Sequence, residues 1–152
     1  MQNILDLFIQ DCKENNLVVN FAQISDSEHL LASFQRLRTK TRLNMWSVSK
    51  GFVSCAAGIA LDEGLISLEE KLIDIFPEYA SLCTSDNIKE ISLEHLLTMS
   101  CGLTTPLFFA DSKEFYTEKN WIQYFFQSDF SHSPGSAWLY SNFNTYMLSC
   151  DN

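Results

Sequence analysis

Two short motifs carry side chains that could act together in nucleophilic catalysis, and the first pairs a serine with a lysine. Ser47 and Lys50 lie three residues apart, so a helix would place both side chains on one face, one turn apart. A serine hydroxyl is a poor nucleophile unless a neighbouring group takes its proton. Desolvation of a lysine favours the neutral amine, which can act as that base. The alternative is a surface lysine whose aliphatic stem lies along the helix.

The second motif, Tyr140-Ser-Asn142, follows a turn at Pro134-Gly135. A tyrosine can act as a base when its pKa is lowered, and a nearby ammonium group lowers it by favouring the phenolate. A buried tyrosine followed by an asparagine cap explains the same residues without any chemistry. Both motifs are short enough to occur by chance, so their context has to decide.

Other side chains with catalytic or metal-binding potential have weaker support. The five cysteines contain no C-x-x-C pair, and His29 and His132 have no metal-ligand spacing, so we expect no metal, no cofactor and no disulfide framework. A cysteine enzyme that uses Cys101 with His95 is a third hypothesis, based on sequence proximity alone. Reduced thiols and an N-terminus without a secretory signal predict a cytoplasmic protein.

The first motif opens a strongly apolar segment that we expect to be a helix from Ser47 to Gly64. Apolar residues occupy nearly every side of this helix, which predicts that it is buried all round. Gly64 suits the left-handed conformation that ends a helix. A lysine at the start of such a helix is unusual, because a buried ammonium group needs partners.

The remaining elements predict an α/β (α+β) fold. The N-terminal ten residues indicate an amphipathic helix, and segments 17–24 and 29–37 indicate a β-hairpin of an antiparallel sheet. Capping-box sequences at Ser67–Glu70 and Ser92–His95 predict two short helices in the helical region that follows. The apolar stripe of the first helix consists of Ile4, Leu5, Phe8 and Ile9.

Composition excludes several classes of function. The 152 residues include 10 Lys and Arg against 19 Asp and Glu, and a net charge of −9 repels nucleic acid. No segment reaches the ~20 apolar residues that cross a membrane. Aromatic residues make up 13% of the chain, which suits a core larger than a small helical domain needs.

Joined in order, the motifs resemble the serine β-lactamase and penicillin-binding-protein superfamily, in its class C β-lactamase-related branch of esterases, carboxypeptidases and aminopeptidases. Several short strings in the right order are far more specific than either motif alone. The strings are Trp46-Ser-Val-Ser-Lys-Gly51, Asp62-Glu-Gly-Leu-Ile-Ser-Leu68, Ile75-Phe-Pro-Glu78, His95-Leu-Leu-Thr-Met-Ser-Cys-Gly-Leu103, Pro134-Gly135 and Tyr140-Ser-Asn142.

The resemblance implies a β-lactamase/transpeptidase-like fold and an acyl-enzyme mechanism on an amide, lactam or ester of a small-molecule or peptide substrate. Ser47 would attack the carbonyl carbon, and Lys50 would hold or relay its proton. Tyr140 would be the second acid/base, and Asn142 would hydrogen-bond the substrate or Lys50. The backbone N–H of Ser47 would form half of the oxyanion hole.

The chain departs from the family in one respect. The third family element, Lys-Thr-Gly or a His-x-Gly variant on a strand beyond Tyr-x-Asn, is not in the sequence. We therefore expect residues 1–152 to form a partial domain that lacks the C-terminal strands and the last helix. Two hypotheses stay open: a serine hydrolase, or a catalytically inactive truncated remnant or module that needs a complementing chain. The second predicts self-association through exposed core surface.

Overall fold

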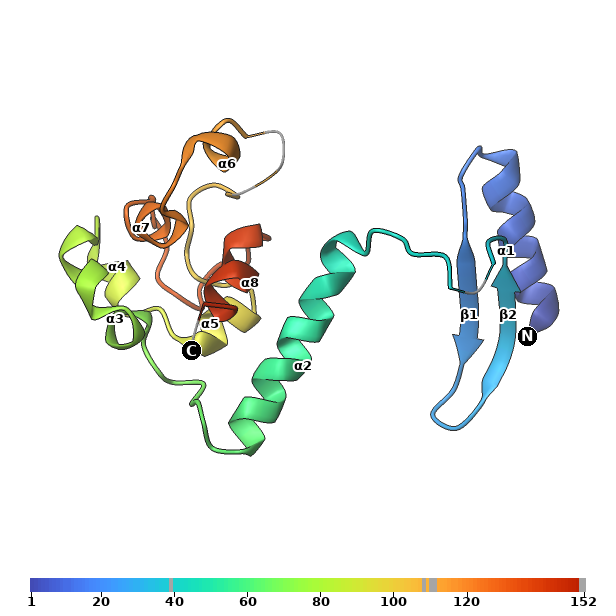
Figure 1. The fold of residues 1–152 in the computed structure, drawn as a ribbon, viewed down its shortest axis with the longest axis horizontal. Helices are drawn as coiled ribbons and strands as arrows, with labels where there is room; N and C mark the ends of the chain where they lie inside the picture. The colour runs from blue at the N-terminus through green and yellow to red at the C-terminus, as the bar shows by residue number, and fades with distance from the viewer. Residues whose placement is uncertain (39, 108, 110–111, 151–152) are drawn as a thin grey trace. The chain divides into compact units, whose positions relative to one another are not determined.

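The computed structural model describes residues 1–38, 40–107, 109 and 112–150. The chain divides into two compact units, Met1–Asn44 and Met45–Asn152. Each unit has its own hydrophobic core, and Figure 1 shows the elements of both.

The N-terminal unit packs one helix against a two-stranded antiparallel sheet. Helix α1 spans Gln2–Glu14, and strands β1 and β2 span Phe21–Ser25 and Leu30–Gln35, which confirms the predicted helix and hairpin. Asp26 holds the turn between the strands because its carboxylate accepts hydrogen bonds from the backbone N–H groups of residues 28 and 29. These two bonds lower the pKa of Asp26.

Only half of the predicted apolar stripe of α1 is buried. Leu5 and Ile9 form the core of this unit with Ala32 of β2, whereas Ile4 and Phe8 are 59% and 50% exposed. A sheet of two strands is too narrow to cover the whole stripe. Among the described residues the sheet has only these two strands, so both of its edges are unpaired.

The second unit begins with a 3₁₀ turn, η1 (Trp46–Val48), that leads into helix α2 (Ser49–Asp62). Helix α8 lies beside both α2 and α5 (Figure 1). The helices after α2 are short: α3 (Leu72–Ile75), η2 (Pro77–Leu82), α4 (Asp86–Lys89), α5 (Leu93–Leu97), α6 (Glu114–Thr117), α7 (Trp121–Phe126) and α8 (Asn142–Leu148).

A cluster of phenylalanine rings joins α7 to α8 in the core of this unit. Phe125 meets Phe126, Phe130 and Phe143 edge to face, with ring centroids 5.9, 5.2 and 5.6 Å apart. All four side chains are at most 1% exposed. Each such ring pair adds about 0.5–1.5 kcal/mol beyond the burial of its area. Because Phe143 is the second residue of α8, the cluster fixes the start of that helix, where Asn142 lies.

The two predicted capping boxes have different outcomes. The box at Ser92 is confirmed, because its backbone N–H donates to Nδ1 of His95 at 3.1 Å and α5 begins at the next residue. The predicted cap at Ser67 is wrong, because the Ser67 hydroxyl donates to the carboxylate of Glu69. The short helix expected before Pro77 is present, but it begins only at Leu72. A local serine–carboxylate hydrogen bond competes with helix capping here.

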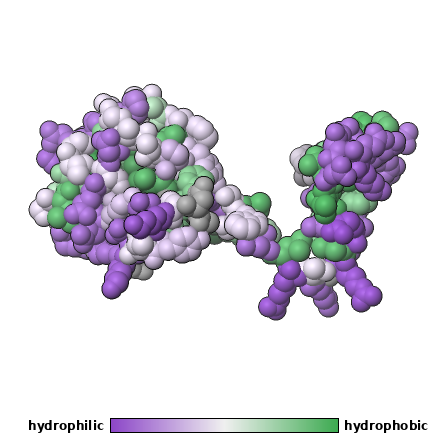
Figure 2. Space-filling view, turned by 90° about the horizontal axis from the view of Figure 1, so that it is seen from above, coloured by the Kyte–Doolittle hydropathy of each residue, from purple (hydrophilic) through white to green (hydrophobic). Residues whose placement is uncertain are grey.

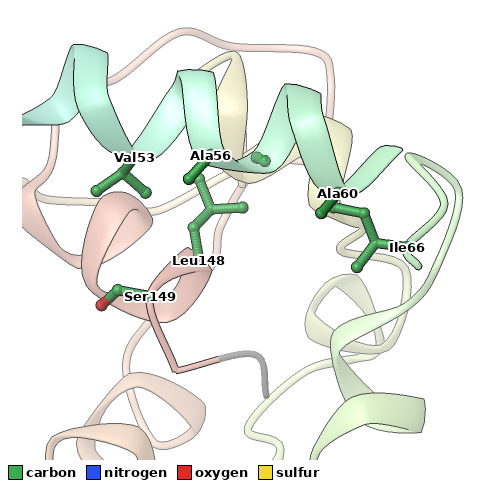
Figure 3. A pocket seen from close by; sticks show the side chains of 7 residues that line it. Val53, Ala56, Ala60, Ile66, Leu148 and Ser149 are labelled. Carbon is green, nitrogen blue, oxygen red and sulfur yellow. The ribbon is translucent and has the colours of Figure 1, made fainter. Parts of the chain in front are cut away.

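Helix α2 is not buried all round, and the sequence prediction on this point is wrong. Every residue of α2 is described, and none is buried. Val53 and Ala56 line an apolar groove of about 310 Å³ with Leu148 of α8, so one face of α2 is partly covered (Figure 3). Phe52 and Ile59, which do not line this groove, are exposed. Apolar side chains accordingly reach the molecular surface (Figure 2).

Candidate active site

Four residues of the two sequence motifs, Ser47, Lys50, Tyr140 and Asn142, lie together, and two of them contact Oγ of Ser47. Lys50 donates a hydrogen bond from Nζ to this oxygen at 3.2 Å, and the Tyr140 hydroxyl donates to it at 2.6 Å. Lys50 Nζ also donates to Oδ1 of Asn142 at 2.7 Å. Residues as far as 93 positions apart in the sequence thus form one hydrogen-bond network.

The backbone next to the nucleophile candidate is strained. Trp46 has φ of 46°, in the left-handed region that bulky residues avoid. The hydroxyl of Ser49 donates to the Trp46 carbonyl oxygen at 2.6 Å and holds this turn closed. Strained residues of this kind cluster at functional sites. No feature of the sequence signals the strain, because tryptophan has no preference for this conformation.

Lys50 is half-buried and is not enclosed by apolar side chains, which corrects the sequence prediction. Its ammonium group is held by polar partners, Ser47 and Asn142, and lies 5.1 Å from the centre of the Tyr140 ring. A cation in this position over an aromatic ring contributes about 0.5–1 kcal/mol at an exposed site. The role of Lys50 therefore follows from these contacts and not from burial.

Tyr140 has a pKa below its ordinary value of 10.0. The hydrogen bond with the Ser47 hydroxyl is the largest cause, followed by the interaction with Lys50, and both favour the phenolate. The ring of Phe109 lies 6.1 Å from the Tyr140 ring, centroid to centroid, and restricts its orientation. The lowered pKa suits Tyr140 to accept a proton.

Ser141, the middle residue of the second motif, holds its two neighbours in place. Its side chain is fully buried, and its hydroxyl donates to the Leu107 carbonyl oxygen at 3.2 Å. Oγ of Ser141 also accepts a hydrogen bond from the Phe143 N–H and so caps α8. The cap of this helix is therefore Ser141, whereas Asn142 is the first helical residue and accepts the hydrogen bond from Lys50. A serine directly before an apolar helical segment is a cap signal that could have indicated this role.

Cys101 and His95 do not form a catalytic pair, so the cysteine hypothesis is wrong. The Cys101 thiol is buried, burial raises its pKa, and it donates to the backbone carbonyl of His95 at 3.4 Å. Nδ1 of His95 is engaged in the cap of α5. Among the described residues, no group of His, Cys, Asp and Glu side chains could hold a metal ion. No helix within residues 1–38, 40–107, 109 and 112–150 is long and apolar enough to cross a membrane.

The fold places the chain among the β-lactamase-like proteins. Residues 21–150 match the Beta-lactamase family, and the chain belongs to that family. Two solved structures with the same fold are a class C beta-lactamase and a class C beta-lactamase mutant in which a tyrosine is replaced by phenylalanine. Each has a TM-score of 0.72 and 19% sequence identity over 94% of this chain.

The chain spans only part of these solved structures. It covers 40% of the length of either one. The structure is therefore a partial β-lactamase-like fold, in which helices accompany a small antiparallel sheet of two strands. No curated protein matches the chain in sequence.

Proposed function

We propose that this chain is a serine hydrolase that forms an acyl-enzyme through Ser47 on an amide, lactam or ester. The observation that carries the proposal is the approach of Lys50 Nζ and Tyr140 Oη to Ser47 Oγ, at 3.2 and 2.6 Å. A serine hydroxyl in contact with an acid/base group is what covalent catalysis by serine requires. Family membership supports the same assignment.

The reaction proceeds in two stages. The phenolate of Tyr140 takes the Ser47 proton as Oγ attacks the carbonyl carbon, and the resulting phenol then gives this proton to the leaving group. In the second stage a water molecule attacks the acyl carbon and Tyr140 takes a proton from this water. The bond between the acyl carbon and Oγ then breaks, Tyr140 gives the proton to Oγ of Ser47, and the carboxylic acid is released. Lys50 stabilises the phenolate in both stages, and Asn142 holds Lys50 in place. The backbone N–H of Ser47 supplies one oxyanion donor.

A second candidate is a chain that is inactive unless a complementing segment binds. It is supported by the 40% of the length of the solved class C structures that residues 1–152 cover, a stretch that contains no Lys-Thr-Gly or His-x-Gly element. Loss of one oxyanion donor lowers a rate by about 10²–10³. The two candidates share the nucleophile and differ in whether this chain turns over its substrate.

Covalent labelling of Ser47 tests the proposal. The purified chain is treated with a fluorophosphonate or a labelled penicillin, and the modified residue is located by peptide mass spectrometry. We expect modification at Ser47 that is lost in Ser47→Ala and retained in Ser49→Ala, a matched variant of a neighbouring hydroxyl. Labelling followed by turnover supports the hydrolase, and labelling without turnover supports the second candidate. If Ser47 stays unmodified while a full-length class C beta-lactamase reacts, both are wrong.

A further inference from the structure

The segment that follows α5 forms backbone hydrogen bonds with the segment that leads to Tyr140. The Leu139 N–H donates to the Met99 carbonyl oxygen at 2.9 Å. The Gly135 N–H donates to the Ser100 carbonyl oxygen at 2.8 Å. Because Leu139 directly precedes Tyr140, its bond to Met99 fixes the backbone from which the tyrosine side chain extends. The position of the Tyr140 hydroxyl therefore depends on the segment after α5.

Met99 has a strained backbone that α5 holds in place. Its φ of 58° lies in the left-handed region, which is unfavourable for methionine. Strain of this kind persists only where the surrounding structure enforces it. Here the His95 carbonyl oxygen accepts hydrogen bonds from the Ser100 N–H at 2.9 Å and from the Cys101 thiol at 3.4 Å. The turn that contains Met99 is thus attached to α5 at His95.

Helix α5 also supports the helix that carries Asn142. Helices α5 and α8 lie side by side (Figure 1). Asn144 is fully buried in α8, and its Nδ2 donates to the Leu96 carbonyl oxygen and to the Cys101 sulfur, both at 3.4 Å. Helix α5 is therefore a common support for Asn142 and Tyr140.

The start of α5 depends on the His95 ring. Its Nδ1 accepts the hydrogen bond from the Ser92 N–H at 3.1 Å, so Nδ1 carries no proton and the ring is a neutral imidazole. Burial is the largest cause that lowers the pKa of His95 below 6.5. Lys71 lowers this pKa further, whereas Glu94 raises it. At neutral pH the ring is therefore in the state that can cap the helix.

The same ring lies against the segment that leads to Tyr140. A Cβ atom added at Gly135 would lie 3.3 Å from Nε2 and 3.6 Å from Cδ2 of His95. Gly135 has φ of 81°, so a glycine there both permits the turn and lets the ring approach the backbone. One side chain thus caps α5 and contacts the Tyr140 segment.

We propose that His95 is a positioning residue for Tyr140, which it holds in place by capping α5 through the Ser92 N–H. The proposal rests on the proposed function of Tyr140. Helix α5 has only five residues, so few of its backbone groups bond within the helix and the cap is a large part of its order. Loss of the cap would let Leu139 shift and would weaken the contacts that lower the pKa of Tyr140.

Two substitutions of His95 test this role. His95→Gln keeps a hydrogen-bond acceptor, because glutamine at this position completes a capping box. His95→Leu keeps an apolar side chain there but has no acceptor. The readout is the ionisation of Tyr140, followed by NMR of isotope-labelled tyrosine rings and assigned with Tyr140→Phe. We expect His95→Leu to raise the pKa of Tyr140 toward 10.0 and His95→Gln to leave it at the wild-type value.

Asn120→Ala is the matched control for a general loss of stability. Oδ1 of Asn120 accepts a hydrogen bond from the Gln123 N–H at 2.9 Å and caps α7, so this variant also loses one helix cap. We expect Asn120→Ala to lower the midpoint of urea unfolding, as His95→Leu does, without raising the pKa of Tyr140. Circular dichroism checks that each variant keeps its helix content.

Labelling of Ser47 separates this proposal from the hydrolase. The rate of modification by a fluorophosphonate should fall at least about tenfold in His95→Leu, because a misplacement of about 1 Å can lower a rate by about 10²-fold. His95→Gln should react at the wild-type rate. A chain whose Ser47 is never labelled, but whose Tyr140 ionisation responds to the two substitutions as expected, would refute the hydrolase and support the positioning role.

Acid titration of the wild-type chain makes the test without a substitution that could unfold α5. Protonation turns Nδ1 of His95 into a donor, which cannot accept the Ser92 N–H. Below the pKa of His95, the protection of the Ser92 and Leu139 amides against hydrogen exchange should therefore fall together. His95→Gln should keep both amides protected at the same pH.

Four results would overturn the proposal. One is a Tyr140 pKa that is unchanged in His95→Leu. Another is an equal rise of this pKa in His95→Leu and His95→Gln, which would mean that the acceptor does not matter. The third is an equal rise in Asn120→Ala, which would mean that any loss of stability displaces the tyrosine. The last is a Leu139 amide that stays protected after His95 is protonated.

Discussion

Replacing Tyr140 with phenylalanine removes a single oxygen from the candidate site and leaves its shape intact. The lost Oη lies 2.6 Å from Ser47 Oγ, whereas the ring keeps its positions near Phe109 and Lys50. A positioned acid/base group contributes about 10²–10⁴ to a rate. At 1.36 kcal/mol per tenfold change, this corresponds to roughly 2.7–5.4 kcal/mol of transition-state stabilisation. We expect the rate constant for Ser47 modification by a fluorophosphonate to fall by the same factor.

The pH dependence of this rate distinguishes a base from a merely structural tyrosine. In the wild-type chain, the rate of Ser47 modification should rise with pH through the pKa of Tyr140, which lies below 10.0. Tyr140→Phe should lose this rise. Its stability, measured by urea unfolding, should fall by about 1 kcal/mol at most, because one exposed hydrogen bond is lost. A variant that reacts as fast as the wild type, with the same pH profile, would refute the reasoning.

Three further substitutions test other parts of the structure. Lys50→Met should move the midpoint of the pH–rate profile upward, toward the ordinary tyrosine pKa of 10.0, because Lys50 is one of the groups that lower the pKa of Tyr140. Phe125→Ala should lower the free energy of unfolding by about 3–5 kcal/mol in urea titrations, because it empties the centre of the ring cluster. Gly102→Ala should destabilise the fold by more than about 1 kcal/mol, because this glycine has φ of 87° and a Cβ atom there would lie 2.1 Å from a backbone carbonyl oxygen. Gly58→Ala, in an open helical position, is its control and should raise stability by about 0.5–1 kcal/mol; a loss at this position as large as at Gly102 would contradict the argument.

Helical periodicity in the sequence predicts that Ser47 and Lys50 lie together. That Tyr140 joins them is predicted only by the family resemblance. Ser47 and Lys50 are one helical turn apart, so their contact follows from local geometry. Tyr140 reaches the same oxygen across 93 positions, and no local pattern encodes that distance. The order of several motifs along the chain supplied the missing information. Neither helical periodicity nor the family resemblance predicts the strained backbone at Trp46.

Local patterns also failed where the surroundings decide the outcome. Ser67 and Ser92 open similar capping-box sequences, yet only Ser92 caps a helix. The difference lies in the side chain with which each serine forms a hydrogen bond. At the second box His95 turns its ring back to the Ser92 N–H, whereas the hydroxyl of Ser67 is taken by Glu69, only two residues away. The capping preference of serine makes a helix start possible at both positions. The neighbouring side chains decide whether the serine caps the helix or forms another hydrogen bond.

Helix α2 shows what a hydrophobic pattern can and cannot predict. Apolar residues on nearly every side of α2 make burial of each side favourable. The sequence shows this preference, but it does not show whether another element packs there. Full burial of a side chain such as Val48, Phe52 or Ile59 contributes about 1.5–3 kcal/mol, so three largely exposed side chains forgo several kcal/mol. That amount is a large share of the roughly 5–15 kcal/mol that stabilises a domain. The pattern therefore predicts the free energy that favours association of this face, whereas the identity of the partner depends on shape and charge.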